Sequence, residues 1–376
     1  MRVRGYISAF ASLLVALMLA AGCNFRPLKE TANVSYVRVY VDEQILNVTT
    51  GFYNKEFRHP TYSRPDILRV ALFDAQSGAL VSERYLRNQG DDERGHYYDG
   101  CIIVEPGTYD FVAYNFGTES TVLSEEYNCF KMCAYTNEIS SAVRTRLQEA
   151  AAASASMAAA AEGAGAEDVA PYSLSDEPSI RYDADHLFVS SAEGLQVAVH
   201  GAVDTLRNSA GEPWFRAESI VKSYYIQIGV RGIQYISSSS SVLSGMAAST
   251  RIIDRDFESG GSTALYFDMT RGRYTKYDQS YACIYSTFGT FGRLPESDNE
   301  IRVSFEFITT YGTRFEKTFD ISRKFLEEDA IVHQWIIIED EIVIPAPPDP
   351  DPDPDLAGGL TPSVDPWGDV ESEFDI

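Results

Sequence analysis

The sequence predicts an all-β fold made of two tandem β-sandwich domains. Its 376 residues include 23 tyrosines and 20 phenylalanines, which are enriched in β-strands. Short segments alternate apolar and polar residues and are separated by turns that contain glycine or proline, which is typical of a sandwich. The length is sufficient for two domains with cores of their own.

Residues 1–22 are typical of a lipoprotein signal peptide. Two arginines precede a small and apolar run from Ile7 to Gly22, which is shorter than the roughly 20 apolar residues of a transmembrane helix. The sequence around Gly22 and Cys23, LAAGC, resembles the bacterial lipobox. The resemblance implies cleavage between these two residues and a diacylglyceryl and an N-acyl chain, such as palmitate, on Cys23. The alternatives are an ordinary signal peptide with a chance cysteine and an uncleaved anchor helix.

A lipid on Cys23 would hold the protein at a membrane. Two or more acyl chains give a lasting anchor, whereas one does not. Residues 23–33 are expected to form the tether, and no later segment is long and apolar enough to span a bilayer. An outer-membrane location is therefore expected. The protein could face the cell surface or the periplasm, because Asn24–Glu30 lacks the acidic run that often accompanies surface display.

The first domain is predicted to span residues 34–204. Val34–Val41 alternates as a strand, and Ile67–Leu86 forms a hairpin around the turn at Asp74–Gly78. Cys101–Val104 and Thr108–Asn115 are further strands, separated by Pro106 and Gly107.

The same residues resemble the fimbrillin-like lipoproteins of Bacteroidales, the family of the minor and anchor subunits of type V fimbriae. The resemblance rests on LRVALFDAQSGALV (68–81), VEPGTYDFVAYNFG (104–117), DADHLFVS (183–190) and SVLSGMAAS (241–249). It implies two transthyretin-like, Greek-key sandwiches in a fimbrial subunit. Partner subunits would bind by β-strand addition, in which an exposed sheet edge gains a strand from a neighbour.

An Ala-rich insertion is predicted at about residues 137–178. Asn137 or Ser140 could cap a helix that runs into the alanines and serines of Ala150–Ala161. The segment has few large apolar residues, so a solvent-exposed helical or disordered insertion is expected rather than a partner-docking helix.

The second domain is predicted at residues 205–345. Its strands are expected at 223–236 around Gly232, and at 263–269, 283–288, 301–310, 313–321 and 334–344. Tyr311 and Gly312 link two of these strands as a hairpin, and the serine run Ser237–Ser241 is expected to be a mobile loop.

Four cysteines remain besides Cys23. A disulfide of Cys101 with Cys129 or Cys133 is one interpretation, and buried free thiols are the other. The five histidines are scattered without metal-ligand spacing to a cysteine pair, so no metal site is expected.

Residues 346–376 are predicted to form a disordered acidic tail. Proline and aspartate alternate from Pro345 to Asp355, which favours extended polyproline conformation. Apolar residues return at Trp367, Val370, Phe374 and Ile376. They could fill pockets along the sheet edge of a neighbouring protein as a donor strand.

No catalytic residue and no cofactor beyond the lipid is expected. P-loop, GxSxG, HExxH and dinucleotide motifs are absent from the sequence. The formal charge of −24 argues against binding to nucleic acid. A membrane-anchored structural, anchor or accessory subunit of a fimbria is therefore expected. The alternative is an outer-membrane lipoprotein that binds a glycan or a peptide.

Overall fold

The computed structural model describes eleven stretches of the chain. These are residues 33–42, 45–48, 57–60, 64–116, 121–124, 128–161, 179–197, 204–254, 261–276, 279–294 and 301–347. Most described residues lie in strands of several sheets, which confirms the all-β prediction.

The first strand group is a nine-stranded sheet with the order β5-β4-β8-β12-β14-β1-β7-β6, in which β13 also pairs with β1. Its strands are β1 (Asn33–Val41), β4 (Leu68–Asp74), β5 (Leu80–Leu86), β6 (Asn88–Asp92), β7 (Gly95–Val104), β8 (Gly107–Asn115), β12 (Phe188–Val197), β13 (Asp204–Thr205) and β14 (Phe215–Ser219). The two ends of the sheet, β5 and β6, are separated only by Arg87. The Ser82 hydroxyl on β5 donates to the Ile103 carbonyl on β7 at 2.6 Å. The sheet therefore curls back on itself around a core of buried apolar side chains.

The second strand group consists of two sheets that face each other across a core rich in isoleucine and phenylalanine. One sheet has the order β11-β18-β16-β21-β22 and the other has the order β19-β20-β15-β23. The strands are β11 (Ile180–Tyr182), β15 (Lys222–Arg231), β16 (Ile236–Ala247), β18 (Ser262–Asp268), β19 (Thr270–Lys276), β20 (Gln279–Thr290), β21 (Arg302–Thr309), β22 (Arg314–Asp320) and β23 (Trp335–Val343).

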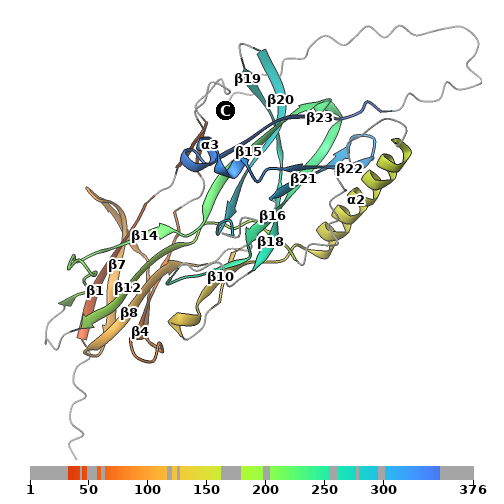
Figure 1. Ribbon diagram of the computed structural model, residues 1–376. Coiled ribbons are helices and arrows are strands. Elements are labelled where there is room, and N and C mark those ends of the chain that lie inside the picture. The colour runs from red at the N-terminus through yellow and green to blue at the C-terminus, as the bar shows by residue number, and fades with distance from the viewer. Residues whose placement is uncertain are drawn as a thin grey trace, which may run out of the picture.

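A small junction sheet with the order β17-β10-β9 lies between the two groups (Figure 1). It consists of β9 (Thr121–Leu123), β10 (Cys133–Thr136) and β17 (Ser249–Arg251). A separate hairpin pairs β2 (Ile45–Val48) with β3 (Phe57–Pro60). The helical elements are α2 (Ser141–Ala161), α3 (Glu328–Val332), η1 (Cys129–Lys131), η3 (Ile233–Tyr235) and η5 (Lys324–Leu326).

Both predicted hairpins are present in the structure. β4 pairs with β5 around a turn in which Gly78 has a φ of 68° and Asp74 accepts from the Ser77 amide at 2.8 Å. β21 pairs with β22, and Gly312 has a φ of 83°.

The prediction of a mobile loop at the serine run is wrong, because Ser237–Ser241 lies within β16, the central strand of its sheet. Ser239 and Ser241 point into the core, whereas the Ser240 hydroxyl donates to Glu306 at 2.6 Å. Pairing with a neighbour on each side overrides the low strand propensity of serine.

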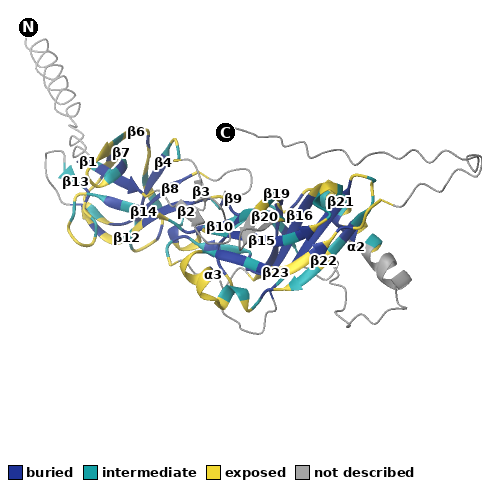
Figure 2. Cartoon of the chain, turned by 90° about the horizontal axis from the view of Figure 1, so that it is seen from above, coloured by how far each residue is buried: buried dark blue, intermediate teal, exposed yellow. Residues whose placement is uncertain are grey.

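The Ala-rich insertion forms α2, and it packs on the second strand group next to β22 (Figures 1 and 2). Ser140 caps it, since its hydroxyl accepts from the Val143 amide at 3.3 Å. Leu147 and Ala150 are buried, and Arg146 reaches Glu306 at 3.2 Å. The insertion is thus helical over Ser141–Ala161, and most of its described side chains are exposed or partly exposed, whereas one face that includes Leu147 and Ala150 packs on the second strand group.

Arg146 is the residue whose removal should loosen α2. The Glu306 side chain is only 4% exposed. Arg146→Ala should therefore leave a buried charge unpaired and lower the free energy of unfolding by on the order of 3 kcal/mol. Arg144→Ala is the matched control, because its 4.0 Å pair with Glu138 is exposed and contributes less than about 0.5 kcal/mol. Urea unfolding of both variants measures the difference, and equal losses would contradict this account.

Candidate anchoring and assembly site

Several residues singled out from the sequence lie outside the described stretches. These are Gly22 and Cys23 of the lipobox and Trp367, Val370, Phe374 and Ile376 of the tail. The predictions for them stay predictions.

Cys101, Cys129 and Cys133 are free thiols in the structure. Cys101 is exposed on β7, whereas Cys129 is buried between the strand groups. The Cys133 sulfur lies 3.3 Å from the Ser124 hydroxyl. The structure forms no disulfide among these three described cysteines, of which only Cys129 is buried, and the choice between a disulfide and buried free thiols stays a prediction.

β1 is the first described strand after the predicted lipid tether, and it is held on both edges. Nine consecutive residues, Asn33 to Val41, pair antiparallel with β7. On its other edge β1 pairs parallel with β13 and β14. Val37 and Val39 are fully buried in the core. β1 is therefore a central strand that is hydrogen-bonded to neighbours on both of its edges.

The outer face of β1 is held by polar contacts. The Arg38 guanidinium lies 3.1 Å from Asp99 on β7 and 3.9 Å from the centroid of the Tyr97 ring. Tyr40 donates to Asp92 on β6 at 2.6 Å. The hydrogen bond from Tyr40 lowers the pKa of Asp92, so this carboxylate stays charged at neutral pH.

Among the described strands, the chain crosses between the two strand groups three times. The chain passes from β8 through β9 and β10 to α2, returns from β11 to β12, and crosses again from β14 to β15. The second connection, residues 183–187, is called the junction segment below.

Backbone groups of the junction segment bind the second strand group and the junction sheet. The amides of Asp183 and Ala184 donate to Tyr266 and Gly289 of the second group at 3.2 and 2.9 Å. The Asp185 amide donates to Thr121 Oγ1 on β9 at 2.7 Å. The junction segment is thus bonded to the first crossing connection as well.

His186 links the junction segment to the third connection. Its Nδ1 lies 2.8 Å from the Ser219 hydroxyl on β14, and its Nε2 lies 2.8 Å from the Ser223 hydroxyl on β15. Burial lowers the pKa of His186 to about 3, so the imidazole is neutral. Both ring nitrogens are therefore hydrogen-bonded to serine hydroxyls, which gives His186 a structural position.

Asp183 is a partly buried carboxyl in the same segment. It accepts from the Gly289 amide at 3.2 Å. Burial raises its pKa to about 7, although the hydrogen bond from Gly289 opposes the shift. Asp183 and His186 therefore both favour their neutral forms in the folded protein.

One hydrophobic cluster fills the junction, and all four of the family-like sequence segments contribute to it. It includes Ala71 and Phe73, Val112 and Tyr114, Ala184, Leu187 and Val189, and Ala247. Residues of the junction sheet, such as Leu123 and Ala134, and of the β14–β15 connection, such as Val221, complete it. Since apolar burial is the main favourable term in folding, this cluster joins the two strand groups.

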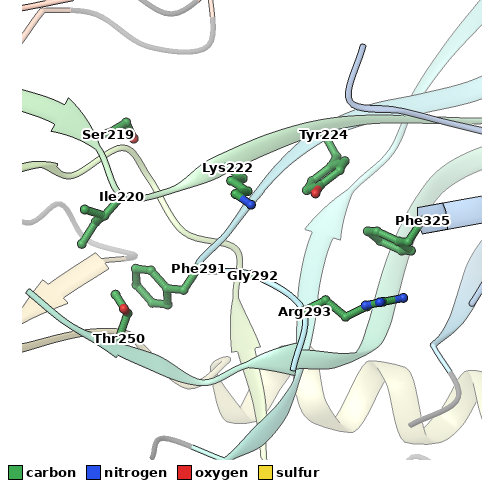
Figure 3. Close-up of a pocket in the computed structure, with 9 residues that line it drawn as sticks. All are labelled: Ser219, Ile220, Lys222, Tyr224, Thr250, Phe291, Gly292, Arg293 and Phe325. Carbon is green, nitrogen blue, oxygen red and sulfur yellow. The ribbon is translucent and has the colours of Figure 1, made fainter. Parts of the chain in front are cut away.

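A cavity of about 350 Å³ opens beside the junction. Figure 3 shows its lining residues, which are Ser219, Ile220, Lys222, Tyr224, Thr250, Phe291, Gly292, Arg293 and Phe325. Two of these residues are basic and none is acidic, in a chain with 55 acidic and 31 basic residues.

Three findings concern metal ligands, membrane spans and the surroundings of Trp214. Within the described stretches no group of three or more His, Cys, Asp or Glu residues could hold a metal ion. No described helix has the length and apolarity needed to cross a membrane. Trp214 packs edge-on against Tyr40, and Arg94 and Arg216 lie over its ring at 5.9 and 5.7 Å from the centroid. Guanidinium groups therefore cover a ring that a glycan would need.

Comparison with known proteins connects the chain to fimbrial proteins. Residues 58–268 match the family described as "Domain of unknown function (DUF5119)". The chain is 22% identical over 326 residues to "Putative fimbrium anchoring subunit Fim4B" of Bacteroides ovatus, which covers 83% of this chain and 78% of that protein. The resemblance to fimbrillin-like proteins that the sequence suggested is confirmed by this relative.

One solved structure has a similar fold, and a second aligns with less of the geometry. The crystal structure of a putative adhesin from Bacteroides ovatus has 20% identity and a TM-score of 0.50, covering 84% of this chain and 94% of that one. The fimbrial anchor protein Mfa2 from Porphyromonas gingivalis has 12% identity and a TM-score of 0.41, covering 82% and 90%. The adhesin supports the arrangement of strands described above.

Asp183→Asn should change how stability depends on pH. The carboxyl stabilises the fold below its unfolded pKa of about 3.9, and this contribution is lost as pH rises to about 7. His186 contributes stability above its unfolded pKa of about 6.5, which is lost as pH falls toward 3. Between pH 4 and 6.5 the folded and unfolded states of the unmodified protein each bind one proton at these two residues. The folded state carries it on Asp183 and the unfolded state carries it on His186, so the free energy of unfolding does not change with pH in this range.

The variant should therefore lose about 1.4 kcal/mol per pH unit, relative to the unmodified protein, as pH falls from 6.5 to 4. It should be the more stable of the two at pH 8. Urea unfolding across this range measures both slopes. Parallel pH profiles for the two proteins would contradict the burial of Asp183.

Gly289→Ala should separate the strand groups. A Cβ at this position would lie 1.9 Å from the carbonyl oxygen of Ala184, which is backbone and cannot rotate away. The cost should be on the order of 3 kcal/mol, with increased proteolysis near the junction segment. Gly100→Ala is the control, because its Cβ would meet only the tip of the Leu86 side chain. Equal melting temperatures for the two variants would count against the junction.

Proposed function

The chain belongs to the DUF5119 family, and we propose that it acts as a lipid-anchored anchoring or accessory subunit of a cell-surface fimbrium. The observation that carries the proposal is the relative named as a fimbrium anchoring subunit, which aligns with most of both chains. The family-like segments meet in the junction core, so the likeness includes the part that joins the strand groups. The protein is not an enzyme but a structural member of the fimbrial anchor and adhesin proteins.

The geometry around β1 suits an anchor. In the proposal the lipid on Cys23 holds the outer membrane, and the tether to Asn33 reaches at most about 33 Å at 3.3 Å per residue. A pull from a fibre would then reach β1, whose nine-residue pairing with β7 resists sliding. The junction core would pass the load to the second strand group.

We further propose that the two strand groups correspond to two transthyretin-like, Greek-key domains. A single boundary between residues 204 and 205 would then not separate the two domains, because each domain includes a strand from the other side of that boundary. β14 (Phe215–Ser219) pairs with β1 and β12 of the first group, whereas β11 (Ile180–Tyr182) pairs with β18 of the second.

β19 is the sheet edge that we propose accepts a strand from a neighbouring subunit. Among the described residues it pairs only with β20, and its sequence, TRGRYTK, is basic. The opposite edge, β23, carries Glu339, Asp340 and Glu341 at a register shift against β15. Bulges and charges of this kind oppose edge-to-edge pairing. The apolar tail residues would be this chain's own donor segment for a neighbour.

Crosslinking in intact cells tests the assembly role. The photoreactive residue p-benzoylphenylalanine in place of Arg273 on β19 should capture fimbrial subunits, because this edge is open. The same residue in place of Glu341 on β23 is the matched control and should capture few. Purification of the protein and identification of the bound chains gives the result. Capture of no fimbrial subunit at either position would overturn the assembly role.

Cys23→Ala tests the anchor. The variant should incorporate no radiolabelled palmitate, because Cys23 is the proposed acceptor of the acyl chains. Metabolic labelling followed by purification of the protein measures the loss. Incorporation equal to that of the unmodified protein would contradict lipid anchoring, whatever the crosslinking result.

A further inference from the structure

We propose that, in the free subunit, the acidic and aromatic end of the chain, residues 364–376, docks into the basic cavity beside the junction. The inference goes beyond the proposed function, because it concerns the subunit before assembly. It holds whether or not the tail later pairs with a neighbour.

The cavity has the chemistry to receive such a segment. Tyr224, Phe291 and Phe325 supply aromatic walls, and Lys222 and Arg293 supply charge at exposed positions (Figure 3). Within the described stretches neither cation forms an ion pair with a carboxylate. A volume of about 350 Å³ lies at the small end of ligand pockets, roughly 300–1,000 Å³, and suits one or two aromatic side chains.

An apolar surface continues from the cavity along the protein. Leu326 follows the cavity residue Phe325, and α3 packs beside η5. Leu326, Ile331 and Val332 are 61%, 64% and 56% exposed. Large apolar side chains gathered on one exposed surface mark a contact site.

The tail matches this site in charge and in apolar residues. From residue 364 onward it contains Trp367, Val370, Phe374 and Ile376. The same residues 364–376 also include five acidic residues, Asp365, Asp369, Glu371, Glu373 and Asp375, and no basic residue. The chain has a net charge of −24, but the only charged residues that line the cavity are basic. An acidic segment is therefore attracted to the cavity rather than repelled from it.

The length of the tail fits the distance. β23 runs parallel to β15, and the described chain ends just after the pairing of Val343 with Arg231. The cavity residue Lys222 begins β15, a strand of 10 residues, so it lies about 30 Å back along the sheet. Residues 348–366 can span about 59 Å at 3.1 Å per residue, so Trp367 can reach the cavity.

The basic edge strand β19 is an alternative docking site for the tail, and it lies closer than the cavity to the end of β23. The length of the Pro- and Asp-rich spacer, residues 345–355, disfavours it. Glu341 pairs with Gly229, Gly229 with Cys283, and Cys283 with Gly272. The middle of β19 is therefore level with the end of β23, about 14 Å away at three strand spacings. The Pro- and Asp-rich stretch 345–355 would be about 34 Å long when extended. This length exceeds the distance of about 14 Å to β19 and is close to the distance of about 30 Å to the cavity.

Photocrosslinking of the full, lipidated protein extracted in detergent tests the docking without any fimbrial partner. With p-benzoylphenylalanine in place of Phe374, we expect crosslinks to Tyr224, Phe291 or Phe325 within the same molecule, at a yield independent of protein concentration. Arg293→Glu should lower this yield at least fivefold. Arg273→Glu, the same charge change on β19, should leave it unaltered.

Two further outcomes decide the matter. Replacing Glu371, Glu373 and Asp375 by lysine in the Arg293→Glu protein should restore the crosslink, which separates loss of attraction from misfolding. Crosslinks to β19, crosslinks to a second copy that rise with concentration, or a yield indifferent to Arg293→Glu would each overturn the proposal.

Discussion

The fold depends on the hydrogen bonds of the junction segment, residues 183–187. A chain that crosses between two strand groups three times would form three loose hinges if each connection were free. Here the backbone of the segment bonds to Gly289 and Thr121, and the His186 ring bonds to serines at both ends of the third connection. The connections are thereby fixed to one another, and the apolar cluster beneath them can close.

The fixed junction explains how the proposed anchor could transmit force. A lipid holds only one end of the chain, so a load must travel through the protein to whatever is attached elsewhere. β1 takes it up by pairing on both edges, and the junction core carries it onward. His186 is neutral there, and burial raises the pKa of Asp183 to about 7, so both groups shift toward their uncharged forms and lower the cost of a buried unpaired charge.

The sequence allowed the local structure to be predicted far better than the long-range contacts. Alternation predicted β1, β4 and β8, and turn residues predicted the hairpins, because these features depend on neighbours in the chain. The family-like segments were recognised, but nothing local indicates that Phe73, Tyr114, Leu187 and Ala247 meet in one cluster. Ser237–Ser241 was misjudged for the same reason, since two paired neighbours make it a strand. The cavity combines residues from distant segments and has no local signature at all.

The most direct test of the central claim, that the junction makes the two strand groups one mechanical unit, is to pull single molecules between residue 24 and residue 347 with optical tweezers. The account predicts that the strand groups stay together until a strand group itself unfolds, so no extension step precedes the first large contour-length gain. A small, low-force step that precedes unfolding, caused by separation of the two strand groups, would contradict it.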